Sequence, residues 1–455
     1  MDSVDKNKDF YSLRKQFPVF IYEKYDLEID DTGLKARFYF KLSNEYRFIP
    51  GIFIPRKEFL HFHIDKPELE NLVFHIGMVE LISYWKAACS PRVIVAAGKL
   101  NENQVNWWKK LYFKGLGEFF YTNGIDARIE DFMTIESTAK QAFANSDFTT
   151  SNGFLVPVGG GKDSVVTLET LVKNEKKVHP FILNPRQASI DTAKNAGFDE
   201  EDILKIYRTI DPVLLQLNAA GFLNGHTPFS ALLAFISLLA ARLAGLANIA
   251  LSNESSANEA TVPGTDVNHQ YSKSFEFEKN FRDYVAEYIS TDVNYFSFLR
   301  PLSELQIARI FSKFSAHFYS FKSCNVGSKT DSWCGKCPKC LFSWIILSPF
   351  VKQDKLIGIF GKNLFNNEGL LVIFEELIGN SETKPFECVG TIDEVNQALV
   401  LTIGKVDEPL PYLLDHYKNL PQFERYGNSK VTVDFSQVNR EHFLSEELLN
   451  LISKA

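Results

Sequence analysis

The stretch Val156-Pro157-Val158-Gly159-Gly160-Gly161-Lys162-Asp163-Ser164 decides the fold of this chain. The apolar run that ends at Val158 predicts a buried strand, three glycines predict a turn, and the apolar spacing after Ser164 predicts a helix. Strand, glycine turn and helix start form the context of an anion-binding loop, because glycines let an oxyanion approach the backbone and the first helical amides are unpaired. Lys162 can add a positive charge to a phosphate, and Asp163 can cap the helix or bind magnesium.

Two common nucleotide loops do not fit this pattern. A Walker A loop would need Gly in place of Val156 and Ser or Thr in place of Asp163, and a dinucleotide fingerprint would need further glycines. The stretch resembles instead the PP-loop of ATP pyrophosphatases, Ser-Gly-Gly-x-Asp-Ser, with Gly159 in place of the first Ser. Enzymes of that class hold the pyrophosphate of ATP and transfer AMP to an acceptor oxygen. A glycine turn without a ligand is the alternative.

The length of 455 residues predicts two or three domains. We expect an N-terminal α+β domain over residues 1–148, a nucleotide-binding domain over 149–350, and a mostly helical α+β region over 351–455. The net charge of −7 argues against a nucleic-acid partner. The polar N-terminus lacks the apolar segment of a signal peptide, and the apolar run 230–251 contains Arg242, which costs about 2.5–3.5 kcal/mol in a bilayer centre. The sequence therefore predicts a cytoplasmic protein without a membrane partner.

Strand and helix patterns alternate from Phe154 onward. The expected strands are 154–158, 178–183, 203–207 and 248–252, and the expected helices are 164–173, 188–196 and 228–244. This order predicts a doubly wound parallel sheet, the HUP-like core of PP-loop enzymes, in which ligands sit beyond the carboxyl ends of the strands. Before this core we expect strands between residues 16 and 64 with a hairpin turn at Asp30–Gly33, helices over 67–88 and 102–120 and a strand over 92–96, and after it a strand over 431–435.

Three strand-end segments should converge on the glycine loop: Asn184-Pro185-Arg186, His226-Thr227 and Ser252–Glu259. The segment 253–273 is dense in hydrogen-bonding side chains and poor in the repetitive Lys and Glu of a plain surface, which favours substrate binding over a solvated loop. The predicted substrate-binding residues are Asn253, Glu254, Ser256, Asn258, Asn268 and Tyr271.

Four cysteines lie close together in the sequence: Cys324, Cys334, Cys337 and Cys340. The last three form Cys-Gly-Lys-Cys-Pro-Lys-Cys, a spacing that can close a tetrahedral zinc site with Cys324 as the fourth ligand. Such a site is structural, since four thiolates leave no open position, and an iron–sulfur cluster is the alternative. Cys388 is expected to be a buried small residue rather than a nucleophile, and His61 and His63 to be ordinary surface or core histidines.

The order of PP-loop, polar strand-end loop, Pro301–Leu305 and cysteine cluster is similar to 7-cyano-7-deazaguanine synthase, which however begins at its PP-loop. The whole chain resembles the UDP-N-acetyl-α-D-muramoyl-L-alanyl-L-glutamate epimerases, the MurL family. The stretches that carry this resemblance are Gly159–Ser164, Ser252–Glu259, Asn268–Ser274, the cysteines with Leu341-Phe342, and Lys384–Gly390.

The resemblance implies that ATP and magnesium are used to convert the terminal L-Glu of UDP-MurNAc-L-Ala-L-Glu to D-Glu through an acyl-adenylate, in peptidoglycan precursor synthesis. It implies that Asp163 holds magnesium, that His269 and Lys273 are the first candidates for the base, and that His226, Glu254 and Glu259 follow. The implied ATP contacts are Gly159, Gly160, Gly161, Lys162, Asp163, Ser164 and Asn184. An amide-, nitrile- or thiol-forming PP-loop enzyme acting on a nucleobase or tRNA, and a nucleotide-binding regulator without turnover, stay open, as does the oligomeric state.

Overall fold

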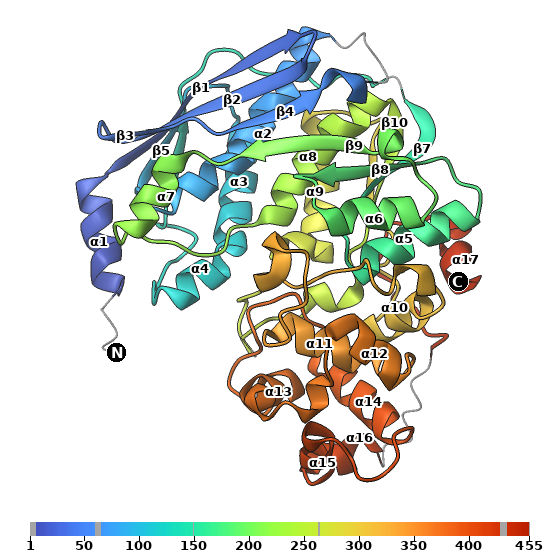
Figure 1. The fold of residues 1–455 in the computed structure, drawn as a ribbon. Helices are drawn as coiled ribbons and strands as arrows, with labels where there is room; N and C mark the ends of the chain where they lie inside the picture. The colour runs from blue at the N-terminus through green and yellow to red at the C-terminus, as the bar shows by residue number, and fades with distance from the viewer. Residues whose placement is uncertain (1–5, 60–64, 149, 263, 428–434, 455) are drawn as a thin grey trace.

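A computed structural model describes residues 6–59, 65–148, 150–262, 264–427 and 435–454. A long sheet with helices packed against it forms one part of the molecule, and a body made of helices forms the other (Figure 1). The expected α/β class is confirmed. The predicted histidines His61 and His63, and all but the last residue of the predicted strand 431–435, lie outside the described residues.

Among the described residues, one sheet contains 11 strands in the order β11-β10-β7-β8-β9-β4-β2-β1-β5-β6, with β3 paired to β2. The first five strands run parallel: β11 (Asn294–Ser297), β10 (Leu246–Leu251), β7 (Ser151–Pro157), β8 (Val178–Leu183) and β9 (Leu204–Thr209). The others are β4 (Gly51–Pro55), β2 (Gly33–Leu42), β3 (Tyr46–Phe48), β1 (Val19–Asp30), β5 (Arg92–Val95) and β6 (Thr134–Ser137).

The parallel strands are buried on both faces. In and just after β7, Phe154, Val156 and Val158 pack in one hydrophobic core, whereas Leu155 between them packs in the other. Helix α5 (Lys162–Lys173) contributes to the first of these cores and helix α8 (Phe229–Ala244) to the second. Strands covered on both faces read as continuous apolar runs, which is why the sequence revealed this part of the sheet.

The N-terminal strands continue the same sheet. Strand β4 pairs antiparallel with β9, where Ile52 lies opposite Arg208. Helix α2 (Lys66–Trp85) is tied to β9 by a bidentate ion pair, in which the Arg208 guanidinium donates to the two Glu80 carboxylate oxygens over 2.5 and 2.8 Å. The hydrophobic core that covers this face runs without interruption across residue 148. The domain boundary expected at residue 148 stays a prediction, and the sheet continues across it.

The helix predicted over 102–120 is wrong in one respect, because it is two helices, α3 (Glu102–Gly115) and α4 (Gly117–Thr122). The break falls at Leu116 between two glycines, which hold a helix poorly. A Cβ on Gly115 would lie 2.7 Å from the Pro228 ring, so only glycine allows this close approach. The break sets Glu118 in the first turn of α4.

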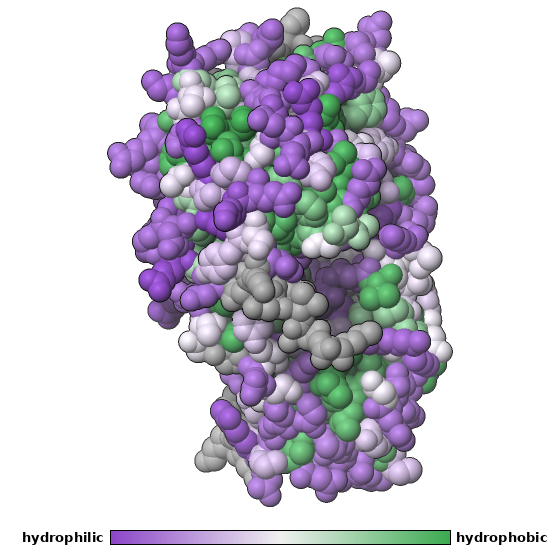
Figure 2. Space-filling model, turned by 90° about the vertical axis from the view of Figure 1, so that its left-hand side faces the viewer, coloured by the Kyte–Doolittle hydropathy of each residue, from purple (hydrophilic) through white to green (hydrophobic). Residues whose placement is uncertain are grey.

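Further helices cover the sheet and build the helical body, in which α11, α13 and α14 pack together (Figure 1). They are α1 (Lys6–Gln16), α6 (Gln187–Asn195), α7 (Pro212–Ala219), α9 (Phe275–Tyr288), α10 (Glu304–Phe311), α11 (Pro338–Leu347), α12 (Gln353–Phe360), α13 (Leu371–Ile378), α14 (Ile392–Ile403), α15 (Tyr412–Lys418), α16 (Pro421–Gly427) and α17 (Glu446–Lys454). Figure 2 shows a hydrophilic hollow between the upper part of the molecule and the helical body. None of the helices in the described ranges is long and apolar enough to cross a membrane.

Candidate functional site

The glycine loop between β7 and α5 packs closely against two other segments. Gly160 has φ +84°, and a Cβ there would lie 2.9 Å from the Ala188 carbonyl carbon. A Cβ on Gly161 would lie 2.7 Å from Ser323 Oγ, whereas a Cβ on Gly159 would meet no atom within 4 Å. The second glycine is therefore required by the fold of the loop, the third packs closely on the Ser323 hydroxyl, and the first faces open space.

A cavity of ≈ 240 Å³ opens beside this loop at the carboxyl ends of the parallel strands. Its cationic lining residues are Arg186, Lys273, Lys322 and Lys339, and Asp163 is the single acidic one among the described residues that line it. Gly159, Gly161, Ser164, Ser252 and Asn253 also contribute. Four cations against one carboxylate make this cavity suited to a polyphosphate.

Four of the seven predicted ATP-binding residues line the cavity, and Gly160, Lys162 and Asn184 do not. Gly159, Gly161, Asp163 and Ser164 line the cavity. The Lys162 ammonium lies buried beneath the loop, where it donates to Asp163 Oδ1 over 2.5 Å and to Glu304. Asn184 exchanges hydrogen bonds of 3.1 and 2.6 Å with the Arg208 backbone and does not line the cavity.

Glu304, the buried acidic partner of Lys162, is part of a group of carboxylates. Burial, with the neighbouring negative charges of Asp163, Glu254 and Glu394, raises the pKa of Glu304 well above its ordinary value against the pull of Lys162. The Glu304 amide donates to Glu394 Oε1 over 2.6 Å, which ties α10 to α14. Lys162 therefore supports the loop from below in this structure.

Two of the cavity cations, Lys322 and Lys339, were missed by the sequence reasoning. Lys339 stands between Cys337 and Cys340, and Lys322 is two residues before Cys324, which itself lines the cavity. The signal available in the sequence was the position of these two lysines, one within the cysteine cluster and one just before it. The cysteine cluster thus carries part of the cavity wall.

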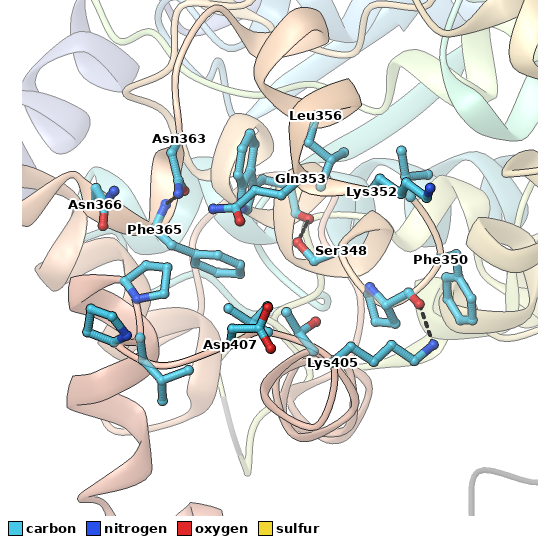
Figure 3. A pocket seen from close by; sticks show the side chains of 18 residues that line it. Ser348, Phe350, Lys352, Gln353, Leu356, Asn363, Phe365, Asn366, Lys405 and Asp407 are labelled. Carbon is cyan, nitrogen blue, oxygen red and sulfur yellow. Dashed lines mark hydrogen bonds between the residues drawn. The ribbon is translucent and has the colours of Figure 1, made fainter.

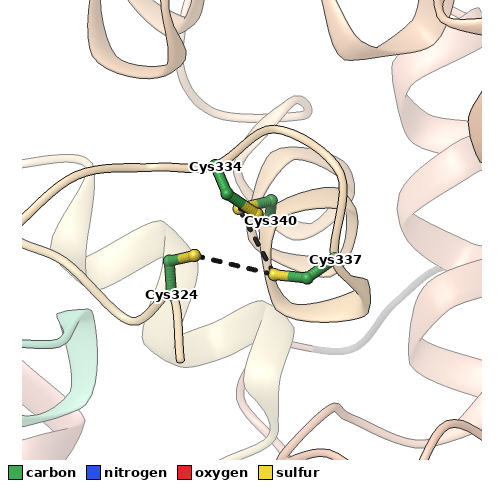
Figure 4. Close-up of side chains that lie close together, drawn as sticks. All are labelled: Cys324, Cys334, Cys337 and Cys340. Atoms are coloured by element: carbon green, nitrogen blue, oxygen red, sulfur yellow. Dashed lines mark hydrogen bonds between the residues drawn. The ribbon is translucent and has the colours of Figure 1, made fainter. Parts of the chain in front are cut away.

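The four clustered cysteines point their sulfurs at one another (Figure 4). The sulfur of Cys337 lies 3.7 Å from that of Cys324 and 3.5 Å from that of Cys340, and the sulfurs of Cys334 and Cys340 are 3.7 Å apart. Zinc–sulfur bonds of about 2.3 Å in a tetrahedron place sulfurs roughly 3.8 Å apart. Backbone amides also donate to the sulfurs, as from Gly327 to Cys324 over 3.1 Å. These residues fit one tetrahedral zinc ion.

A second cluster joins the first region of the chain to the predicted catalytic segment. His269 Nδ1 hydrogen-bonds Glu118 Oε2, and His226 Nδ1 lies 3.6 Å from the same oxygen. Burial, with the charge of His269, lowers the pKa of His226 to about 4. Burial acts in the same direction on His269, but Cys388 and Glu118 outweigh it and raise the pKa of His269 to about 9. One imidazole is therefore neutral and the other charged at neutral pH.

Cys388 belongs to this cluster. Its sulfur lies 3.2 Å from Lys273 Nζ, and the His269 ring lies beside it. Burial opposes ionisation of the thiol, but Lys273, Lys339 and His269 outweigh it and lower the pKa of Cys388 to about 5. The residue is half-buried, and the expectation of a buried space-filling residue overlooked these polar neighbours.

Lys273 joins the cavity to the cluster. It lines the cavity of the glycine loop, and the same ammonium contacts the Cys388 sulfur. The negative charges of Cys388 and Glu254 raise the pKa of Lys273 against its burial, so it stays charged. Lys273 would therefore lie next to an anionic group bound at the glycine loop. It would also lie next to a proton that is exchanged at Cys388 or His269.

The six predicted substrate-binding residues are distributed over several places. Asn253 lines the loop cavity, and Asn258, Asn268 and Tyr271 line a second cavity of ≈ 370 Å³. Glu254 and Ser256 are buried. Glu259, a reserve candidate for the base, pairs with Lys384.

A cavity of ≈ 670 Å³, larger than the two described above, lies within the helical body (Figure 3). Trp344, Phe350 and Phe365 contribute rings to it, and the Lys405 ammonium at its edge donates to the Pro349 carbonyl over 2.7 Å. None of the predicted site residues lines it.

Comparison with known proteins decides the family. A family model described as the MurL N-terminal domain matches residues 11–298, more than half of the chain, and one described as the MurL C-terminal domain matches residues 320–416. The chain belongs to the MurL family. Its glycine loop and His269 lie in the first match, and its four clustered cysteines and Cys388 lie in the second.

Relatives of this MurL-family chain carry one name, UDP-N-acetyl-alpha-D-muramoyl-L-alanyl-L-glutamate epimerase. The protein from Xanthomonas oryzae pv. oryzae is 35% identical over 340 residues, which cover 73% of this chain and 74% of the relative. The protein from a Micromonospora species is 37% identical over 337 residues, covering 72% and 73%. The protein from Salinispora tropica is 36% identical over 326 residues, covering 70% of each chain.

Proposed function

We propose that this protein is a cytoplasmic enzyme of peptidoglycan precursor synthesis. It inverts the terminal L-Glu of UDP-MurNAc-L-Ala-L-Glu to D-Glu, with consumption of ATP and release of AMP and pyrophosphate. The names of the relatives support the substrate and the inversion. The cation-lined cavity at the glycine loop supports the use of ATP.

The need for ATP follows from the acidity of the substrate. The α-proton of a free carboxylate is hard to remove, because the resulting carbanion lies beside a negative charge. Transfer of AMP to the carboxylate gives a mixed anhydride, which masks that charge and allows an enolate to form. Protonation from the opposite face inverts the centre, and water then releases AMP. Electrostatic stabilisation of the developing charge is the main contribution expected from the protein.

The loop residues would bind the nucleotide. Gly159, Gly161 and Ser164 would surround the phosphates, and Lys322, Lys339 and Arg186 would balance their charge. Asp163 would hold magnesium, since its side chain is 31% exposed and lines the cavity. Bound there, magnesium would neutralise phosphate charge during AMP transfer. The four clustered cysteines would hold a structural zinc ion.

The single observation that carries the proposal is the position of Lys273. Adenylation requires a phosphate site and epimerisation requires groups that carry protons, and the two must meet at one carboxyl group of the substrate. Lys273 borders the loop cavity and contacts Cys388, which is a neighbour of His269. We assign both residues to the glutamyl group, His269 as a proton donor and Lys273 as the cation that faces the activated carboxyl group.

The test is an incubation with ATP, magnesium and UDP-MurNAc-L-Ala-L-Glu in deuterated water. Release of pyrophosphate is measured together with deuterium at the glutamyl α-carbon and with the D-Glu content of the product. The expected result is all three, each dependent on the acceptor. Pyrophosphate release without α-exchange would indicate adenylation for another transfer and would overturn the epimerase.

A further inference from the structure

Cys388 has the surroundings of a reactive thiolate. Its sulfur contacts the Lys273 ammonium at 3.2 Å and lies beside the ring of His269, which is itself hydrogen-bonded to Glu118. A cysteine that only fills space has apolar neighbours, whereas reactive thiolates lie in electropositive, partly exposed surroundings. Tyr121 of α4 also packs on Phe386, with ring centroids 5.4 Å apart, which holds this segment against the helix that carries Glu118.

We propose that the Cys388 sulfur is a catalytic proton acceptor of the epimerisation, paired with His269 across the glutamyl α-carbon, and that Glu118 positions His269. This inference rests on the function proposed above and names two groups that act within it. Cys388 and His269 come from different family matches, so the paired groups are brought together only in the folded chain.

The proton transfers balance without a further reactant. The thiolate takes the α-proton, so the C–H bond breaks, an S–H bond forms, and the electron pair moves into the acyl-adenylate carbonyl to give the enolate. The His269 imidazolium then gives its N–H proton to the opposite face, and the electron pair returns to form the new C–H bond. The thiol afterwards passes its proton to the neutral imidazole, which restores both charges. The α-carbon must enter between the sulfur and the imidazole.

The first proton transfer requires a Cys388 thiolate and a protonated His269, and the surroundings of the two groups favour these states. Lys273, Lys339 and His269 face Cys388, with Glu387 next to it in the chain, and the balance sets the pKa of the thiol at about 5. The pKa of His269, at about 9, keeps the imidazole protonated at neutral pH. An acceptor in its basic form beside a donor in its acidic form is what efficient proton transfer needs.

The decisive experiment compares wild type with Cys388→Ala and with Cys89→Ala, a matched control that removes the other cysteine outside the four-sulfur group. Pyrophosphate release and α-deuterium incorporation are measured in the same sample. In Cys388→Ala we expect α-exchange to fall on the order of 10²-fold or more, while pyrophosphate release stays within about threefold of wild type. Unchanged exchange in Cys388→Ala, beside an active wild type, would overturn this inference and leave the proposed function intact. An inactive wild type would instead overturn the proposed function.

Alkylation keeps the inference testable if Cys388→Ala does not fold. Wild-type protein is treated with iodoacetamide at mildly acidic pH, and the labelled cysteines are identified by mass spectrometry. We expect Cys388 to react faster than a free thiol such as glutathione at the same pH, because only the thiolate is nucleophilic. Labelling of Cys388 no faster than that of the free thiol would contradict the thiolate.

The positioning role of Glu118 predicts a shift in a pH profile. In Glu118→Gln, the His269 ring loses the charge that favours its protonation, and Cys388 in turn loses part of its cationic surroundings. The midpoint of the alkylation rate of Cys388 should move to higher pH. A purely structural role for Glu118 would change the amplitude of labelling and leave this midpoint in place, which would contradict the positioning role.

Discussion

The loop cavity and the Glu118–His269–Cys388 cluster are neighbours, but they are built in different ways. The loop owes its shape to one short stretch of backbone, in which Gly160 has φ +84° and packs on α6. The cluster depends on side chains that are far apart in the sequence, since Glu118 precedes His269 by 151 residues and Cys388 follows Lys273 by 115. A site that is built from one short stretch of backbone can be recognised in a sequence. A site that is built from side chains distant in the sequence can be recognised only once the fold is known.

Lys273 gives the sharpest test of the boundary between the two regions, because it belongs to both. In Lys273→Met, pyrophosphate release should fall through loss of a phosphate contact, and α-exchange should fall through loss of the cation beside Cys388. We expect a combined loss of roughly 10²–10⁴-fold in epimerisation. The measurement is the rate of each partial reaction on the purified variant.

Lys322→Met is the matched control for Lys273→Met. Lys322 lines the loop cavity, and its ammonium donates to the Tyr319 carbonyl over 2.8 Å, away from Cys388. Pyrophosphate release should fall in this variant, whereas α-exchange per adenylate formed should match wild type. Equal losses of both reactions in the two lysine variants would show that cavity and cluster do not act separately.

Removal of the zinc ion proposed for the four clustered cysteines should damage the part of the cavity wall that carries Lys339. We expect chelation to weaken ATP-dependent pyrophosphate release on the order of 10- to 100-fold, the range seen when groups that support a binding site are lost. Metal content, the thermal unfolding midpoint and ATP binding would be followed together. Retention of full ATP binding in metal-free protein would contradict a supporting role for the cysteine cluster.

The sequence predicted the elements whose signal is local. The parallel strands around β7, which the structure confirms, follow from apolar runs of neighbouring residues. The pairing of β4 with β9 could not be predicted, since strand partners distant in sequence leave no periodic trace. Glu118 was missed because a continuous helix was expected where a break at Leu116 turns the chain.

The predicted site residues show the same division. Asp163 and Ser164 line the cavity, as their place after the glycines suggests, whereas Asn184 is occupied by the Arg208 backbone. Cys388 looked isolated, because its partners Lys273 and His269 lie more than 100 residues earlier in the chain. Isolation in a sequence therefore says nothing about which side chains surround a residue in the fold.

Two glycines of the loop test its dependence on backbone. In Gly160→Ala, the positive φ and the approach to Ala188 strain the loop, and we expect a loss of about 1–3 kcal/mol in the free energy of unfolding. Gly159→Ala faces open space and should leave stability unchanged. Urea unfolding of both variants is the measurement. Equal stability of the two would mean that the conformation of Gly160 does not constrain the loop.

The smallest effect is expected for the stability that the Glu118–His269 contact contributes. The pKa of His269 is raised from 6.5 to about 9 in the folded protein, so protonation favours folding. This stability is fully present below pH 6.5 and is lost as pH rises through about 9. In Glu118→Gln the amide oxygen can still accept the hydrogen bond, and the loss of charge should cost about 1 kcal/mol.

The measurement is urea unfolding of wild type and Glu118→Gln across this pH range. The difference between them should be largest just below pH 6.5 and should vanish above about pH 9. Glu375→Gln is the matched control, because Glu375 pairs over 2.5 Å with His416, whose side chain is 31% exposed and therefore screened by solvent. A pH-independent difference for Glu118→Gln would mean that the carboxylate supports the fold without acting on the charge of His269. The cluster, like the loop, would then affect stability through its structure alone, and the two regions would differ only in where they lie.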